Sequence, residues 1–188
     1  MKGSDSPTQY NYTLELPEGA KLEKTENGEI TIFTKEGAFI GGILAPWAID
    51  ALGVAVPTSY QIEGDQLIQI VDHLNGSFQY PIIADPWLGN KLIISAAWKN
   101  LASGASLRVS PTAFARSMAV TPASYNVGVA GWTELSKRYP IPYNKNSMKN
   151  QYICHQIAPA AALKSTWNLD EWRPDVGLLE TVNKLCNP

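Results

Sequence analysis

The stretch YPIIADPWLGNKLIISAAW, residues 80–98, contains the change of pattern that decides the fold. Before it, apolar and polar residues alternate in short runs, which is typical of half-buried β-strands. After it, apolar and small residues recur at helical spacing, and residues 87–101 are predicted to form a helix that includes Leu88 and Leu92. The sequence therefore predicts a β module over residues 10–85 and a mainly helical module over residues 86–188.

Turn signals separate the predicted strands of the first half. Asn27-Gly28 and Gly64-Asp65 are pairs that favour tight hairpin turns. Pro81 cannot donate a ladder hydrogen bond, so it places the last strand at an edge. The predicted antiparallel strands, which would form a meander, are 13–16, 29–34, 38–44, 58–62, 66–71 and 78–83.

Helices dominate the predicted second half. A short extended section at 106–112, continued by 113–118, interrupts them, and the remaining helices are predicted at 129–139, 147–157 and 174–186. Runs of strands followed by runs of helices predict an α+β fold.

Composition and charge argue against two classes of partner. Only 17% of the residues are charged and the formal net charge is −2, so no basic surface for nucleic acid is expected. The mostly apolar run at residues 92–97 is far shorter than the roughly 20 residues of a membrane span. The polar residues 1–7 are compatible with a chain from which an export signal has been removed.

The two cysteines, Cys154 and Cys186, either remain thiols or form a disulfide. They lack CxxC spacing, and His73 and His155 are the only histidines, so neither a structural zinc site nor another cofactor is expected. A disulfide would close a long loop and would indicate an oxidising compartment.

Several segments resemble known families. GWTELSKRYP, SMKNQYICHQIA and STWNLDEWRPDVGLLETVNKLCNP, within residues 106–188, resemble a domain of unknown function in exported proteins of Gram-positive bacteria, especially actinobacteria. Residues 45–86, which begin APWAIDALGVAVPTSYQIEGDQLIQIVDH and end YPIIADP, resemble an amino-terminal β module that precedes varied carboxy-terminal segments. The resemblance implies export, a Cys154–Cys186 disulfide and modularity. From the residue pattern we expect the β-meander module to pack beside the disulfide-clamped helical module. It implies no catalytic residue.

The segment TWNLDEWRPDVG, residues 166–177, is open to two interpretations. In the first it is a structural corner: Pro174 and Asp175 start the last helix, the two tryptophans cap the helical layer, and Arg173 pairs with a nearby carboxylate. An apolar stripe of that helix would then lie on the helix that contains Cys154. In the second interpretation it holds sugars or cationic groups. The candidate binding residues are Trp167, Trp172, Arg173 and Tyr152.

His155 is the candidate general base, because imidazole titrates near neutrality. Its orienting carboxylate would be Asp170, Glu171 or Asp175. Cleavage of a glycoside would need a second acid, for which Glu134 and Glu180 are available. The alternative is a buried helix histidine hydrogen-bonded to the last helix.

These observations favour a secreted interaction protein or toxin-like antibacterial effector without a complete catalytic constellation. The alternative is a secreted hydrolase that cleaves cell-envelope glycan or peptide with His155 and a carboxylate. The expected partner is a bacterial cell-envelope component or a protein receptor. Contact with a membrane is expected only after residues 87–101 are exposed, for example by removal of the β module through cleavage near Asp85.

Overall fold

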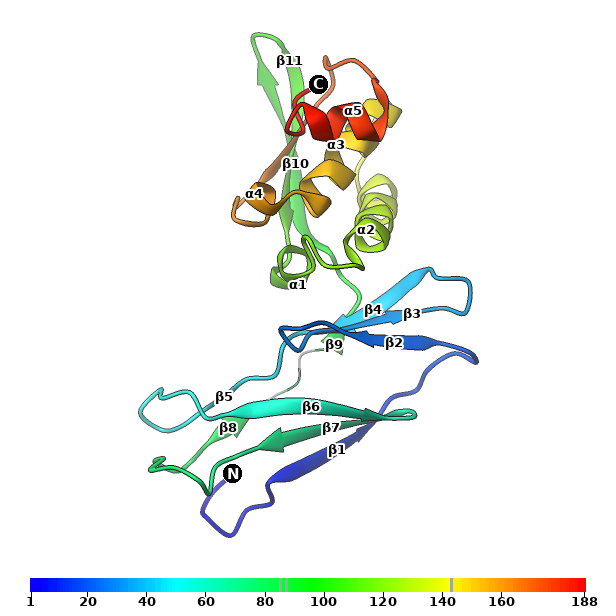
Figure 1. Cartoon of the computed structure of the whole chain (residues 1–188). Coiled ribbons are helices and arrows are strands. Elements are labelled where there is room, and N and C mark those ends of the chain that lie inside the picture. The colour runs from blue at the N-terminus through cyan, green and yellow to red at the C-terminus, as the bar shows by residue number, and fades with distance from the viewer. Residues whose placement is uncertain (85, 87, 143) are drawn as a thin grey trace. The chain divides into compact units, whose positions relative to one another are not determined.

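The computed structural model describes residues 1–84, 86, 88–142 and 144–188 (Figure 1). The chain divides into two compact units, which we call the N-terminal unit (Met1–Glu36 with Ile40–Gly89) and the C-terminal unit (Gly37–Phe39 with Asn90–Pro188). The first contains antiparallel strands and the second contains the helices, so the α+β prediction is confirmed. Asp85 and Trp87, at the predicted junction, lie outside the described residues.

Small antiparallel sheets make up the N-terminal unit. In one, the order is β1 (Gln9–Thr13), β7 (Gln66–Val71) and β6 (Thr58–Glu63). Another has the order β2 (Lys21–Lys24), β3 (Ile30–Phe33), β4 (Phe39–Ile43) and β9 (Leu88–Gly89). The third pairs β5 (Ala48–Ile49) with β8 (Ile83–Ala84). Consecutive strands β2, β3 and β4 are neighbours, as in a meander. In contrast, β1 pairs with β7, which lies more than fifty residues later in the sequence.

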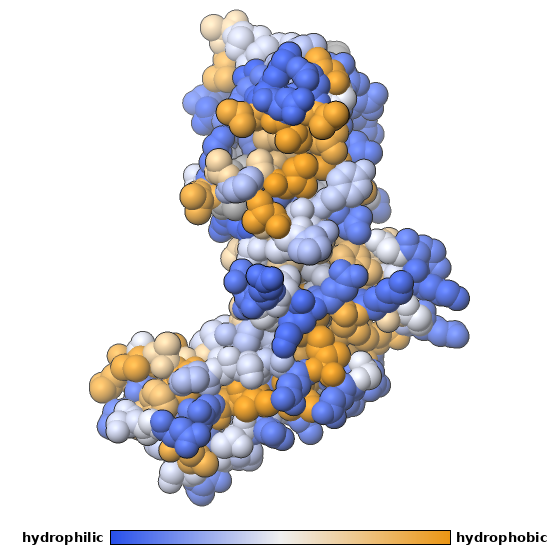
Figure 2. All heavy atoms as spheres, in the orientation of Figure 1, coloured by the Kyte–Doolittle hydropathy of each residue, from blue (hydrophilic) through white to orange (hydrophobic). Residues whose placement is uncertain are grey.

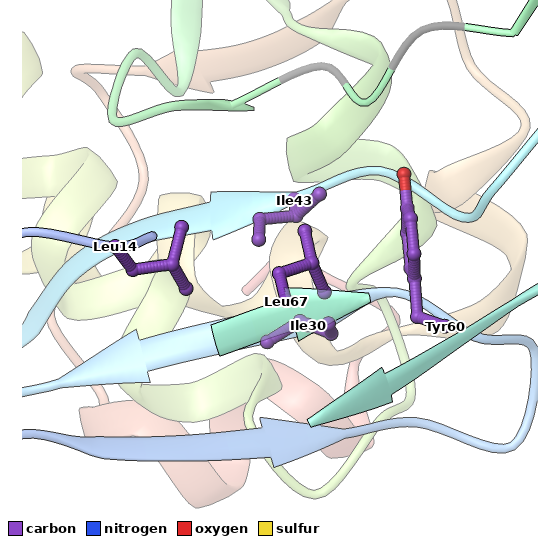
Figure 3. Packing of buried hydrophobic residues seen from close by; sticks show 5 residues of the cluster. All are labelled: Leu14, Ile30, Ile43, Tyr60 and Leu67. Atoms are coloured by element: carbon purple, nitrogen blue, oxygen red, sulfur yellow. The ribbon is translucent and has the colours of Figure 1, made fainter. Parts of the chain in front are cut away.

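The turn predicted at Gly64-Asp65 joins β6 to β7. Gly64 has φ +62°, a conformation that glycine adopts without steric cost. Alternate residues of β7 are buried, as the sequence pattern predicts for a half-buried strand. Five buried side chains of this unit form one core cluster (Figure 3): Leu14, Ile30, Ile43, Tyr60 and Leu67.

A three-stranded antiparallel sheet and several helices form the C-terminal unit. The strands, in spatial order, are β10 (Ile93–Leu101), β11 (Gly104–Pro111) and β12 (Trp167–Asp170). The helices are α1 (Ala113–Ser117), α2 (Ser124–Arg138), α3 (Lys145–Ile157), α4 (Pro159–Ala162) and α5 (Gly177–Asn183). The predicted helices 129–139 and 147–157 correspond to α2 and α3, which begin earlier than expected.

The helix predicted over residues 87–101 is wrong. Residues 93–101 form β10, which pairs with β11 along its length. Small residues such as Ala96 and Ala97 fit both a helix and a strand, so the pairing with β11 decides between them.

Further boundaries differ from the prediction. The strand predicted at 13–16 shares only Thr13 with β1, which begins earlier, at Gln9. Residues 113–117 form helix α1 because the Thr112 hydroxyl caps it by accepting a hydrogen bond from the Ala115 amide at 3.1 Å. Of the strand predicted at 78–83, Ile83 alone belongs to β8. The last helix starts at Gly177 rather than Pro174, because residues 167–170 are drawn into the sheet as β12 and the chain needs a connecting turn.

None of the helices in the described parts of the chain has the length and apolar character needed to cross a membrane. Apolar residues are nevertheless visible on the surface of both units (Figure 2). In β10 the exposed fractions are 60% for Ile94, 37% for Trp98 and 38% for Leu101. Leu92 and Ile93, in contrast, are buried, so the segment from residue 92 to residue 101 has both exposed and buried apolar side chains.

Candidate functional site

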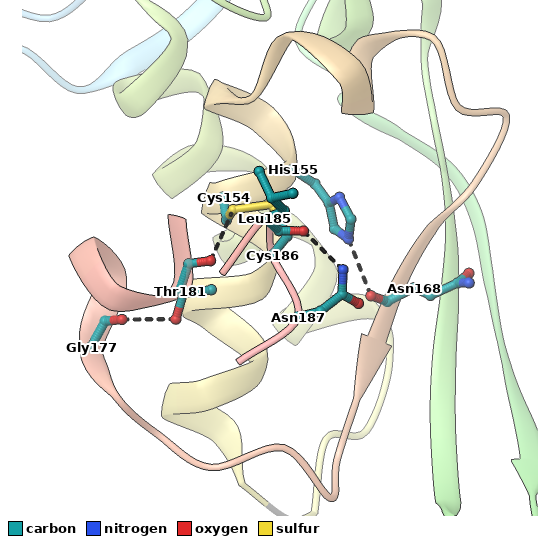
Figure 4. The surroundings of a disulfide bond; sticks show 8 residues. All are labelled: Cys154, His155, Asn168, Gly177, Thr181, Leu185, Cys186 and Asn187. Atoms are coloured by element: carbon teal, nitrogen blue, oxygen red, sulfur yellow. Dashed lines mark hydrogen bonds between the residues drawn. A yellow bond between two sulfur atoms is a disulfide. The ribbon is translucent and has the colours of Figure 1, made fainter. Parts of the chain in front are cut away.

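The disulfide joins α3 to the segment that follows α5 (Figure 4). Cys154 and Cys186 are both buried and their Cα atoms are 5.5 Å apart, so the predicted pairing is confirmed. Beside it, the buried Thr181 donates a hydrogen bond from its hydroxyl to the Gly177 carbonyl at 2.7 Å. The bridge therefore clamps the short helix α5 against α3, alongside the contacts that these two helices make.

The apolar stripe predicted on the last helix is only partly correct. Leu179 is 78% exposed, whereas Thr181 is buried against α3. Because α5 begins later than expected and has less than two full turns, its inner face is narrow. A hydroxyl that bonds its own helix backbone can occupy that face without an unsatisfied polar group.

Two side chains of α3 form hydrogen bonds with backbone groups at the outer edge of β12. Gln151 donates from Nε2 to the Asp170 carbonyl at 2.9 Å and accepts at Oε1 from the Asp170 amide at 2.8 Å. One helical turn later, His155 Nε2 lies 3.2 Å from the Asn168 carbonyl oxygen. Since residues four apart share one helix face, Gln151 and His155 act together as a substitute for a neighbouring strand.

The environment of His155 holds it neutral. A carbonyl oxygen can only accept, so Nε2 carries the proton, and buried Nδ1 has no hydrogen-bond partner among the described residues. Burial lowers the pKa of His155 from 6.5 to about 4, and the ring stacks on Trp167 with centroids 6.1 Å apart. The histidine is buried as the alternative interpretation expected, but it bonds β12 instead of the last helix.

Protonation of His155 is expected to make stability depend on pH. Because its pKa of about 4 in the folded protein lies below the 6.5 of the exposed side chain, the unfolded chain binds the proton first. The contribution of the neutral His155 ring to the free energy of unfolding is complete above pH 6.5. It is lost as pH falls toward 4, and the free energy of unfolding then decreases by about 2–3 kcal/mol. Urea unfolding at several pH values measures this loss, and His155→Gln should flatten the curve in that window. An unchanged slope in the variant would contradict the assignment.

The Asp170 carboxylate is a structural hub. Its Oδ1 accepts a hydrogen bond from the Ser106 hydroxyl at 2.6 Å, and its Oδ2 accepts from Arg173 Nε at 2.8 Å. Arg173 also donates from a terminal nitrogen to the main-chain oxygen of Pro188 at 3.2 Å. The predicted pairing of Arg173 with a carboxylate of this segment is thus confirmed, and it ties the end of the chain to β12.

The other candidate carboxylates have separate partners. Glu171 accepts from the Ala105 amide at 2.9 Å, and Asp175 accepts from the Asn150 side chain at 3.0 Å on the surface. Glu134 accepts from the Leu92 amide at 2.7 Å, and Glu180 lies 3.6 Å from Lys184. These bonds hold main chain and helix surfaces in place, which is a structural use of each carboxylate.

The two tryptophans of the segment occupy different environments. Trp167 is fully buried, with its ring edge-to-face against Tyr152 at 5.3 Å between centroids. Tyr152 is itself buried, which raises the pKa of its hydroxyl, and it packs so close to Gly131 that a Cβ there would lie 2.3 Å from the hydroxyl oxygen. Trp172 is half-buried over Gly104. Of the candidate binding residues, Trp172 and Arg173 are therefore partly open to solvent, whereas Trp167 and Tyr152 belong to the core.

Several residues of this arrangement carry no signal in the sequence. Gln151, Ser106 and Gly104 are ordinary residues at ordinary spacings, and they meet β12 or Trp172 only because the sheet brings distant segments together. Within the described ranges, no group of three or more His, Cys, Asp and Glu side chains is arranged to hold a metal ion.

Comparison with known proteins places the C-terminal unit in a family. A model described as a protein of unknown function, DUF2599, matches residues 93–188, slightly more than half of the chain. The chain belongs to the DUF2599 family. Its DUF2599 region therefore includes all three strands of the β10–β11–β12 sheet, the disulfide and the Asp170 hub.

Mycobacterial proteins are among the relatives. The chain is 34% identical over 104 residues to the uncharacterized protein Rv0477 of Mycobacterium tuberculosis and to the uncharacterized protein Mb0487 of Mycobacterium bovis. The match covers 52% of this chain and 66% of each relative, just under two thirds of their length. No solved structure matches the chain. The expected membership in a bacterial family of unknown function is confirmed for the DUF2599 region.

Proposed function

We propose that this chain is an exported bacterial protein that acts by binding a component of a bacterial cell envelope, as a toxin-like effector or receptor ligand, and not by catalysis. The observation that carries the proposal is that His155 and Asp170 both have structural roles. Both hold β12 against its neighbours, one through the Asn168 carbonyl and the other through Ser106 and Arg173. A general base must be reachable by substrate, whereas His155 is 4% exposed.

Export is supported by the disulfide. Disulfide bonds form and persist in oxidising compartments and are rare in the reducing cytosol. Cys154 and Cys186 form such a bond in the DUF2599 region. A protein stabilised in this way is suited to work outside the cell, where the partner would be a surface component or a secreted protein.

The proposal is tested by mixing the purified chain with bacterial cells and measuring bound protein, cell survival and release of envelope fragments. The key variant is His155→Gln, whose amide can still donate to the Asn168 carbonyl but cannot act as a base. We expect the folded variant to bind and to affect cells as the parent protein does. A hydrolase that depends on His155 would lose activity by about 100-fold or more while remaining folded and bound.

Leu179→Ala is a matched control, because it changes an exposed side chain of the same unit. Far-UV circular dichroism and the melting temperature show whether each variant is folded. Fragment release by the parent protein, abolished in folded His155→Gln, would overturn the binding proposal in favour of the hydrolase.

A further inference from the structure

An ordered hairpin projects from the N-terminal unit at residues 48–56. Val56 donates from its amide to the Ala48 carbonyl, and the Asp50 amide donates to the Val54 carbonyl, each at 2.9 Å. Ile49 and Ala55 form the bridge between these two pairs. Gly53 has φ +80° at the turn, where its amide donates to the Asp50 carbonyl at 3.0 Å. We call residues 49–55 the hairpin tip.

The carboxylate of Asp50 organises the tip from inside. Its Oδ1 accepts from the amides of Leu52 at 2.9 Å and Val54 at 2.8 Å, and its Oδ2 accepts from the Gln79 amide at 2.9 Å. The Ala51 amide donates to the Gln79 carbonyl at 2.9 Å. Each amide from residue 50 to residue 54 is therefore bonded within the protein. The hydrogen bond from the Gln79 amide has the largest effect among the interactions that hold the pKa of Asp50 below its usual range.

Apolar side chains cover the outside of the tip. Leu52 is 74% exposed and Val54 is 51% exposed. Ile49 and Ile83, which are paired between β5 and β8, are also exposed. In Figure 2 apolar residues gather at the end of the loop that joins β5 to β6 in Figure 1. From residue 45 to residue 57 the only charged side chain is Asp50, and it is buried.

We propose that the hairpin tip inserts into a lipid bilayer, with Leu52 and Val54 reaching the acyl chains just below the headgroups. Entry into lipid is costly for unbonded amides and for charges. In this tip the amides of residues 50–54 are all bonded, and the one charged side chain, Asp50, is buried. A protein partner would fit the tip less well. Protein interfaces contain about one hydrogen bond per 100–200 Å² of interface area, and the tip has few free hydrogen-bond donors. This inference rests on the proposed function and deepens it by naming a partner for the N-terminal unit.

The test is co-sedimentation of the full chain with vesicles of phosphatidylcholine and, separately, of phosphatidylglycerol. We expect binding to both, with little change when salt rises from about 0.1 M to about 0.5 M, because no exposed charge lies at the tip. The double variant Leu52→Ser, Val54→Ser should bind at least about tenfold less, because each serine removes apolar surface that lipid would cover. Leu179→Ser is the matched control, since it replaces an exposed leucine of the other unit, and its binding should be unchanged.

Because both tip side chains are exposed, the double variant should keep the parent melting temperature, which is checked first. Equal vesicle binding by parent and double variant would overturn the inference, as would binding to phosphatidylglycerol alone that disappears at high salt. Binding to cells that depends on Leu52 and Val54 without any binding to vesicles would indicate a protein partner. That result would also overturn the lipid inference but would leave the proposed function intact. Tip-dependent binding to vesicles without binding to cells would support the inference and overturn the proposed function.

Discussion

Replacing both Cys154 and Cys186 with alanine is expected to lower the free energy of unfolding of the DUF2599 region by about 3–4 kcal/mol. The bridge joins residues 32 positions apart, so its loss releases a long loop in the unfolded chain. It also frees α5, which is too short to be stable by itself. Urea unfolding followed by tryptophan fluorescence measures the change, because Trp167 packs against α3, the helix that carries Cys154.

Lys184→Ala provides the comparison, since it alters the exposed surface of the same segment and should change stability by less than about 0.5 kcal/mol. The buried sulfur atoms should also make the native protein resistant to reductants, because exchange requires access of a thiolate to the disulfide. A double variant within about 1 kcal/mol of the parent would show that the disulfide does not hold α5 in place.

Trp167→Ala is expected to cost about 3–5 kcal/mol, whereas Trp172→Ala, five residues along, should cost about 1–2 kcal/mol. Trp167 is fully buried between Tyr152 and His155, so its removal leaves a cavity that the surrounding rings cannot fill. Trp172 lies half-buried over Gly104, where water can replace part of the ring. Urea unfolding at pH 7 measures both losses.

The same pair of variants separates stability from binding. If Trp172 contacts a partner, Trp172→Ala should weaken binding to cells by more than its loss of stability explains. Trp167→Ala should affect binding only in proportion to the unfolded fraction. Equal stability of the two variants would contradict the assignment of Trp167 to the core.

The spacing of apolar residues along the chain was sufficient to predict those elements whose residues fit either a strand or a helix but not both. The β6–β7 hairpin alternates around a glycine turn, and residues 129–139 and 147–157 repeat apolar residues at helical spacing. Each of these predictions is confirmed because propensity, period and turn residues agree. The resemblance to a bacterial family correctly implied that Cys154 and Cys186 form a disulfide, whereas the residues alone had left open whether they remain thiols.

The sequence indicated which residues belong to the candidate site, but it did not indicate how they are arranged in space. The segment at residues 166–177 contains the residues that matter, including Asp170, Arg173 and Trp167. Their roles depend on Ser106, which lies 64 residues away from Asp170 in the sequence, and on Gln151. A carboxylate near a histidine in sequence suggests catalysis, and only the contacts show that both are bonded to the sheet.

The sequence by itself determined the α+β class, the hairpin at Gly64-Asp65 and the two long helices, because those depend on neighbours along the chain. Tertiary structure decided that residues 93–101 form a strand, since the apolar and small residues of this segment fit either period until β11 supplies the hydrogen bonds. It also decided that His155 is a neutral partner of β12. Burial lowers the pKa of the ring and keeps it neutral, whereas the Asn168 carbonyl places the remaining proton on Nε2.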